Sequence, residues 1–246
     1  MKLKERLKKD FRLWARSLAD LFLKRECICC CRLLEAFESD VCTFCLAELP
    51  SSYTWTSEES PADKTFWGRT CIEKVTSLFL YNGKYRNLVY SIKYGGNIRL
   101  GIRLGRMLGE VIAIAEEDID FIVPVPLHWR KKRKRGYNQS EEIGRGILLA
   151  LREKIPNVKM EKRLLNRKDF TPTQTRKDRA DRWTNVREAF RVNLKRAKAL
   201  AANGKVPKIL ICDDVLTTGA TLDACASLLH EALDCRISIA TLAYVP

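Results

Sequence analysis

The fold class of this 246-residue chain is decided by the stretch Ile209-Leu210-Ile211-Cys212-Asp213-Asp214-Val215-Leu216-Thr217-Thr218-Gly219-Ala220-Thr221. Its apolar start predicts a buried strand, which delivers two adjacent carboxylates, Asp213 and Asp214, to its carboxyl end. A short turn follows and opens a predicted helix. Because backbone N–H groups at such a turn and at a helix N-terminus attract negative charge, the stretch predicts an anion site beside two acids.

The turn residues narrow the kind of anion. Thr217, Thr218 and Thr221 add hydroxyl donors, and Gly219 lets the backbone approach a phosphate closely. Two carboxylates directly before a phosphate site suit vicinal hydroxyl groups, such as the 2′ and 3′ groups of a ribose. The alternative is a helix N-cap beside two solvated aspartates, which does not explain why the hydroxyls, the glycine and the acids coincide.

Apolar runs alternate with amphipathic segments on both sides of this stretch. The predicted strands are residues 76–81, 121–125, 205–212 and 236–244, and the predicted helices are residues 87–94, 98–115, 140–151 and 220–232. Strands that alternate with crossover helices predict an α/β fold with a mostly parallel sheet covered by helices. Ligands of such sheets bind at the carboxyl ends of the strands.

Four of the ten cysteines have the spacing of a metal site. Cys27 and Cys30 form one CxxC pair, and Cys42 and Cys45 form a second pair eleven residues later. Two such pairs complete a tetrahedral four-cysteine site for zinc, which would organise a unit too small to fold on its core alone. The alternative is a set of buried or redox-active cysteines. Because Cys29 and Cys31 flank Cys30, the exact ligands among Cys27, Cys29, Cys30 and Cys31 stay open.

Four ranges complete the predicted organisation: an amphipathic helix in 1–26, the four-cysteine unit in 27–50, a linker in 51–75 and the α/β domain in 76–246. With 46% hydrophobic residues, the chain is not expected to be disordered. No apolar run reaches the roughly 20 residues that span a bilayer, and charges interrupt the N-terminal apolar residues, which argues against a secretory signal. We therefore expect a cytoplasmic protein whose cysteines do not form a disulfide framework.

The net charge of +15 is concentrated in one part of the chain. Residues 128–196 contain 22 Lys plus Arg against 8 Asp plus Glu, an excess of +14. Six consecutive cations, residues 130–135, follow a predicted strand that ends in prolines. This concentration predicts a polyanionic ligand, either phosphate groups or nucleic acid, although a solvated basic loop has the same composition. Trp129, Tyr137 and Trp183 lie among the cations, where they would either stack on bases or pack the loop.

The stretch from Ile209 to Thr221 resembles the phosphoribosyl-pyrophosphate (PRPP) motif of type I phosphoribosyltransferases. The segment that leads from Val123-Pro124-Val125-Pro126 to Gly136-Tyr137-Asn138-Gln139 is similar to the pyrophosphate-side loop of the ComF family, and Lys93-Tyr94-Gly95 resembles a turn of that family. A further group of residues resembles the family's mobile hood loop: Leu165-Asn166-Arg167, Thr171-Pro172-Thr173-Gln174, Arg182, Asn185-Val186 and Phe190.

This resemblance implies a type I phosphoribosyltransferase-like sheet with a small N-terminal zinc unit. It assigns the ribose hydroxyls of PRPP to Asp213 and Asp214, and the 5′-phosphate to Thr217, Thr218, Gly219, Ala220 and Thr221. The pyrophosphate side falls to Arg135, Gly136, Tyr137, Asn138 and Gln139, with magnesium accompanying PRPP. No general base stands out, so the catalytic residues and the acceptor are not identified.

Two functions follow from the resemblance. The first is transfer of phosphoribose from PRPP to an acceptor, by positioning and electrostatic stabilisation. The second is a non-catalytic role in competence, in which the chain binds single-stranded DNA or proteins of the DNA-uptake machinery and keeps only the nucleotide-type pocket. Type I relatives are often dimers, so a homodimer is also expected.

Overall fold

The computed structural model describes residues 25–54, 61–66, 71–115, 118–168, 187–202 and 204–246. The chain divides into two compact units, Met1–Leu49 and Pro50–Pro246. We describe each unit by itself. Residues 1–24 of the N-terminal helix predicted in 1–26 lie outside the described residues.

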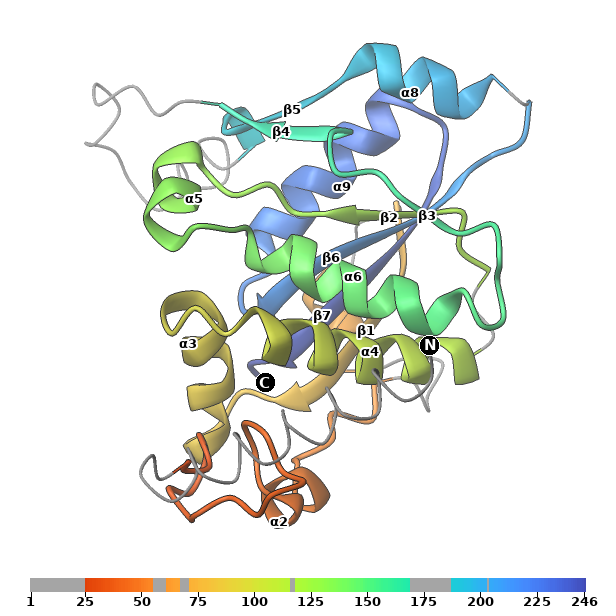
Figure 1. Cartoon of the computed structure of the whole chain (residues 1–246). Coiled ribbons are helices and arrows are strands. Elements are labelled where there is room, and N and C mark those ends of the chain that lie inside the picture. The colour runs from red at the N-terminus through yellow and green to blue at the C-terminus, as the bar shows by residue number, and fades with distance from the viewer. Residues whose placement is uncertain (1–24, 55–60, 67–70, 116–117, 169–186, 203) are drawn as a thin grey trace, which may run out of the picture. The chain divides into compact units, whose positions relative to one another are not determined.

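A five-stranded sheet forms the centre of the second unit (Figure 1). Its strands, in spatial order, are β1 (Ile72–Leu80), β7 (Arg236–Tyr244), β6 (Lys208–Leu216), β2 (Phe121–Pro124) and β3 (Lys159–Met160). All neighbouring strands are parallel. β6 and β7 are almost continuously buried, as expected for strands covered on both faces. The predicted parallel α/β class is therefore confirmed.

Helices cover both faces of this sheet (Figure 1). On one face α4 (Ile98–Ile114) and α6 (Gln139–Leu151) pack against each other and against the strands, with α3 (Arg86–Tyr94) beside α4. On the other face lies α9 (Ala220–Ala232), which also packs against a two-stranded antiparallel ribbon of β4 (Leu165–Arg167) and β5 (Phe190–Val192). The remaining helices of this unit are α5 (Trp129–Arg135), α8 (Leu194–Ala201) and the 3-10 helices η1 (Asp63–Phe66) and η2 (Gly83–Tyr85). None of the described helices is both long enough and apolar enough to cross a membrane.

The structure differs from the sequence prediction between residues 51 and 75. β1 begins at Ile72 rather than at Thr76, because the charged pair Glu73 and Lys74 occupies its partly exposed start. Ala62 and Phe66 lie in the main apolar core of the second unit, and the Asp63 carboxylate accepts a 2.8 Å hydrogen bond from the Val75 N–H. The described part of this segment is therefore packed onto the sheet rather than being a free linker.

Glycines allow α4 and α6 to cross in close contact. A Cβ atom at Gly105 would overlap the backbone carbonyl of Ile143, and one at Gly109 would lie 2.8 Å from the Cβ of Ala150. Gly101, one turn earlier on the same face of α4, has space, because its nearest neighbour would be the Ile92 side chain at 3.5 Å. The distance between the two helices is thus set at Gly105 and Gly109 and not at Gly101.

Substitution of Gly105 by Ala is expected to destabilise the protein by about 2–4 kcal/mol, because backbone atoms of α6 must move to accept the methyl group. Gly101→Ala is the matched control. It adds the same methyl group to the same helix without a clash and is expected to stabilise the protein by about 0.5–1 kcal/mol through helix propensity. Denaturant unfolding followed by circular dichroism measures both. Equal effects of the two substitutions would contradict this account of the packing.

The first unit is small and rich in cysteine. An antiparallel bridge between Glu26 and Leu33 closes its first turn, and α2 (Thr43–Ala47) carries its second CxxC pair, with Cys42 as its N-cap and Cys45 within it. The buried apolar residues of its described part are Cys27, Cys29, Val41, Cys42 and Cys45. Since four of these five are cysteines, the apolar core alone is too small to stabilise the unit.

Candidate functional site

The topology of the sheet places a crevice between β2 and β6. β2 leads through α6 to β3 on one side of the sheet, whereas β6 leads through α9 to β7 on the other side. Neighbouring strands whose connections run in opposite directions mark the point where open parallel sheets bind ligands. The last residue pair between these strands is Pro124 and Cys212. β6 continues to Leu216 beside β7, so its acid pair extends past the end of β2.

The two acids of β6 have different partners. The Asp213 Oδ1 atom accepts a 2.7 Å hydrogen bond from the Ser140 hydroxyl at the start of α6 and a 2.9 Å bond from the Asp214 N–H. The Asp214 Oδ1 atom forms a 2.8 Å ion pair with Lys93 of α3. The other carboxylate oxygen of Asp214 is buried and has no hydrogen-bond partner among the described residues. A buried carboxylate oxygen without a donor is costly, and it is available to a ligand hydroxyl group.

Burial, and after it the negative charge of Asp214, raise the pKa of Asp213 from 3.8 to about 7. Hydrogen bonds from Ser140 and from the Asp214 N–H, together with Lys93, act in the opposite direction and do not compensate. Ionisation of Asp213 is therefore unfavourable in the folded protein, because burial and the adjacent carboxylate of Asp214 both oppose it.

The turn after β6 forms a small cradle. A cavity of about 60 Å³ is lined by Asp213, Val215, Thr217, Thr218, Gly219, Ala220, Thr221 and Leu222. Gly219 has φ +73° and directly precedes α9, so the N-terminus of this 13-residue helix opens at the cradle. Phe66 supports the turn from behind, since a Cβ atom at Gly219 would lie 2.8 Å from its ring. The sequence analysis missed Phe66 because it is surrounded by the polar and Pro-containing residues of the predicted linker.

The six consecutive cations form helix α5 rather than a loop. The His128 side chain caps this helix by accepting a 3.2 Å hydrogen bond from the Arg130 N–H, and Gly136 ends it with φ +83°. The His128 ring also stacks on Trp129. His128 therefore has a structural role, as the N-cap of α5.

Three of the predicted pyrophosphate-side residues make internal contacts. The Tyr137 hydroxyl donates to the Ile92 carbonyl, and burial raises the pKa of Tyr137. The Asn138 amide donates a 3.0 Å hydrogen bond to the Val125 carbonyl and caps α6 through the Ser140 N–H. Gln139 accepts a 2.8 Å bond from Arg135. The contacts of Tyr137, Asn138 and Gln139 thus hold α5, α6 and the end of β2 together. Among the predicted pyrophosphate-side residues, Arg135 is the one with a charged side chain.

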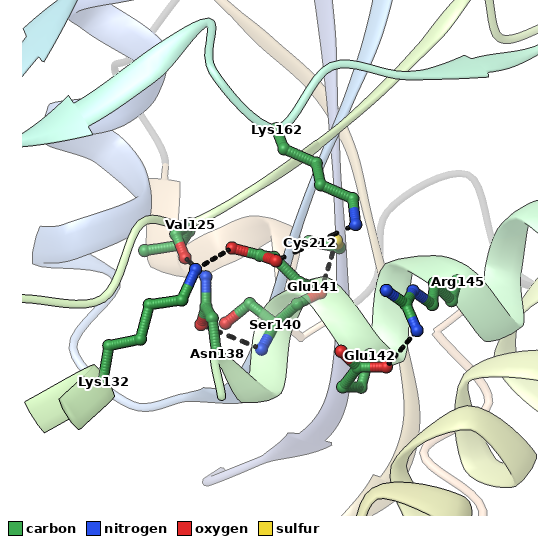
Figure 2. A network of polar contacts seen from close by, with 9 residues as sticks. All are labelled: Val125, Lys132, Asn138, Ser140, Glu141, Glu142, Arg145, Lys162 and Cys212. Atoms are coloured by element: carbon green, nitrogen blue, oxygen red, sulfur yellow. Dashed lines mark hydrogen bonds and ion pairs between the residues drawn. The ribbon is translucent and has the colours of Figure 1, made fainter. Parts of the chain in front are cut away.

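Figure 2 shows the polar network at this junction. Glu141 lies between two cations, 3.0 Å from Lys132 of α5 and 3.8 Å from Lys162. The Cys212 thiol of β6 donates a 3.5 Å bond to the Ser140 carbonyl. One acid therefore neutralises part of the basic segment and fixes α5 to α6.

The hood residues are only partly described. β4 and β5 contain Arg167 and Phe190, and the Arg167 guanidinium lies 5.1 Å above the Phe190 ring. Burial lowers the pKa of Arg167, and the charges of Cys225 and Asp213 oppose this shift without cancelling it. The predicted hood residues Thr171-Pro172-Thr173-Gln174, Arg182 and Asn185-Val186, and the aromatic residue Trp183, lie outside the described residues.

In the first unit the sulfur atoms of Cys27, Cys30, Cys42 and Cys45 all lie within 4.8 Å of one another. The distance between the sulfurs of Cys30 and Cys42 is 3.7 Å. Sulfurs bound to one tetrahedral zinc ion at 2.3 Å are about 3.8 Å apart, so the four thiols fit such an ion. Cys29 and Cys31 do not belong to this group, and the register of the first CxxC pair is the one that the spacing favoured.

Backbone donors support the cysteine group. The Cys42 N–H donates to the Cys27 sulfur at 3.3 Å, and the Cys45 N–H donates to the Cys42 sulfur at 3.5 Å. Burial opposes ionisation of Cys27, but N–H groups of Cys42, Cys30 and Cys29 outweigh it and lower the pKa of that thiol to about 6. Such N–H···S bonds stabilise thiolate ligands of a metal.

Residues 122–246 match the family described as phosphoribosyl transferase domain. Competence protein F of Haemophilus influenzae is 32% identical over 112 residues, which cover 45% of this chain and 44% of that protein. DNA utilization protein YhgH of Salmonella typhi and of Salmonella typhimurium is 27% identical over 162 residues, which cover 64% of this chain and 66% of each relative. The chain thus matches less than two thirds of the length of these relatives.

Among solved structures, the chain is similar to glutamine PRPP amidotransferase from B. subtilis complexed with ADP and GMP. It has a TM-score of 0.39 and 17% identity, over 57% of this chain and 25% of that chain.

Proposed function

This chain belongs to the phosphoribosyl transferase domain family and is a ComF-family phosphoribosyltransferase-like protein, and from this membership we propose that its crevice binds PRPP. The observation that carries the proposal is the buried oxygen of Asp214 without a donor, next to the cradle of residues 217–221. A ribose 5-phosphate unit supplies both missing partners, since its hydroxyls donate hydrogen bonds and its phosphate accepts them.

Each side of the crevice then has one task. Asp213 and Asp214 hold the 2′ and 3′ hydroxyls, and the backbone N–H groups of Thr217–Thr221 with the N-terminus of α9 hold the 5′-phosphate. Arg135, at the end of α5, faces the pyrophosphate. Gly136, Tyr137, Asn138 and Gln139 position this helix rather than contact the ligand, which refines their predicted role.

Magnesium that accompanies PRPP would supply positive charge to the leaving pyrophosphate, in addition to the charge of Arg135. Transfer of phosphoribose would break the bond between C1 of the ribose and the pyrophosphate oxygen as an acceptor atom bonds to C1. The residues of the crevice contribute by fixing the ribose and by stabilising separated charge. The acceptor and any general base are not assigned.

A titration of the full-length protein with PRPP and magnesium tests this function. We expect one PRPP per chain by calorimetry, and a loss of affinity of at least tenfold in Gly219→Ala, because a side chain at φ +73° strains the cradle and meets Phe66. Gly204→Ala is the matched control. Gly204 also has a positive φ, of +67°, but a Cβ atom there meets nothing, so PRPP affinity is expected to stay within twofold. No binding to the wild-type protein would refute the proposal.

A second function is favoured by the names of the relatives and by the charge of α5. The relatives are a competence protein and a DNA utilization protein, and α5 presents six cations without an acid. We therefore propose that the chain also acts on single-stranded DNA, alone or with proteins of the uptake machinery. In this proposal it is a cytoplasmic protein and forms a homodimer. Its four-cysteine group would hold a structural zinc ion, which leaves no ligand position open for catalysis.

A further inference from the structure

A second cavity lies between α3 and α5, apart from the cradle. Its volume is about 380 Å³, and its lining residues are Lys93, Tyr94, Gly96, Lys131, Lys134 and Arg135. Four of these residues are cations and none is a carboxylate. The volume is within the range of pockets that hold a small molecule of the size of a nucleotide.

An aromatic surface borders this cavity. Tyr94 is 61% exposed and Tyr90, one helical turn earlier, is 64% exposed. Their ring centroids are 4.9 Å apart, and the Arg135 guanidinium lies 4.9 Å from the centre of the Tyr94 ring. The bond from Arg135 to Gln139 holds the guanidinium in this position. Exposed aromatic rings beside fixed cations are the arrangement on which nucleic-acid bases stack.

The cations of α5 divide between two faces of the helix. Lys131, Lys134 and Arg135 follow the three- and four-residue spacing of one face and line the cavity. Lys132 lies on another face and is paired with Glu141. Neither Lys131 nor Lys134 forms an ion pair with a carboxylate in the described part of the chain, so both ammonium groups are available to an anion.

We propose that this cavity binds a nucleotide, with its base stacked on Tyr94 and its phosphate held by Lys131 and Lys134. The same chemistry is offered by a free nucleotide and by one unit of single-stranded DNA. The site goes beyond the proposed PRPP pocket, although Lys93 lines the cavity and pairs with Asp214, so the two sites are neighbours. A pyrophosphate group would also suit the cations, but it has no ring to stack on Tyr94.

The test uses the full-length protein and two probes, a fluorescein-labelled thymidine dodecamer in anisotropy and free thymidine monophosphate in calorimetry. Tyr94→Ala is expected to weaken binding by roughly 5- to 100-fold through loss of stacking, whereas Tyr94→Phe stays within twofold. Lys134→Ser is expected to weaken binding of the dodecamer. It is also expected to reduce the slope of the logarithm of the binding constant against the logarithm of the salt concentration by about one. Arg133→Ser is the matched control, because Arg133 has the same charge on the far face of α5.

The outcomes separate this site from the PRPP pocket. Binding of either probe that depends on Tyr94 and persists with saturating PRPP supports the proposal, and the stronger probe identifies the source of the nucleotide. Displacement of the probe by PRPP, or equal effects of Lys134→Ser and Arg133→Ser, would overturn it. PRPP titration of the Tyr94→Ala protein checks the fold and the proposed function independently, since Tyr94 is exposed and its loss is expected to leave PRPP affinity unchanged.

Discussion

Replacement of Asp213 by Asn is expected to stabilise the protein at pH 8 and at the same time to weaken PRPP binding by roughly 10- to 100-fold. The amide keeps an oxygen for the hydrogen bonds from Ser140 and from the Asp214 N–H, so the local structure is retained. It removes the negative charge beside Asp214 and with it the charge-assisted bond of Asp213 to a ribose hydroxyl, worth about 1.5–3 kcal/mol. Calorimetry with PRPP and denaturant unfolding measure the two effects.

The pH dependence of the stabilisation follows from the pKa of Asp213. Its folded-state pKa of about 7 lies above the ordinary value of 3.8, so the native state binds more protons than the unfolded state between these values. Wild-type stability therefore falls as pH rises from about 4 to about 7, and the Asn variant lacks this loss. Because the carboxylate is partly exposed, we expect a gain of about 1–3 kcal/mol above pH 7 that shrinks toward pH 4.

Asp118→Asn is the control for this result. Asp118 is exposed near the amino ends of the strands, and a hydrogen bond from Lys208 lowers its pKa. Its replacement is therefore expected to reduce stability slightly above pH 4 and to leave PRPP affinity unchanged. If Asp213→Asn were less stable than the wild type at pH 8, the strain attributed to the acid pair would be wrong.

Removal of one cysteine of the group is expected to abolish metal binding and to unfold the first unit. The wild-type protein is expected to contain one zinc ion per chain, and the Cys42→Ser variant none. Structural zinc contributes about 10–16 kcal/mol to small domains of this kind, far more than the few buried apolar residues near Val41 supply. Metal analysis of the purified protein and limited proteolysis of residues 25–49 measure both consequences.

Cys31→Ser is the matched control for the metal site. Cys31 lies next to Cys30 but is exposed and outside the group of four sulfurs. Its substitution is expected to leave the zinc content and the protease resistance unchanged. A metal-free wild-type protein that resists proteolysis, or equal zinc loss in both variants, would exclude the four-cysteine assignment.

The sequence predicted those parts of the fold in which local pattern and burial agree. The helix over 220–232 and the last strand over 236–244 have the predicted bounds, because apolar periodicity and clear breakers mark both. Helix α5 was missed because six like charges and nearby prolines indicate a loop. The caps at His128 and Gly136 and the ion pair between Lys132 and Glu141 offset the repulsion among these charges. The ion pair joins two different helices, so the sequence of α5 alone does not reveal it.

The candidate site, like the fold, was predictable where its residues are neighbours in the sequence. The order of strand, acids, glycine turn and helix is local in sequence, so its residues were found without the structure. Lys93, Ser140 and Phe66 contact these residues only through the tertiary fold, and no local pattern marks them. The stacking surface of Tyr90 and Tyr94 was not predicted, because the sequence does not show that both rings are exposed and adjacent on α3.

The strand order has a consequence for the synthesis of the protein. In the described sheet β7 is the only strand beside β1, and it follows β1 in the chain by more than 150 residues. β2 likewise waits for β6, which follows it by more than eighty residues. The sheet therefore cannot close before β7 has been synthesised, whereas the four-cysteine group of the first unit precedes all strands of the sheet. A nascent chain could fold the metal unit early and would carry unpaired, aggregation-prone strands until β7 emerges.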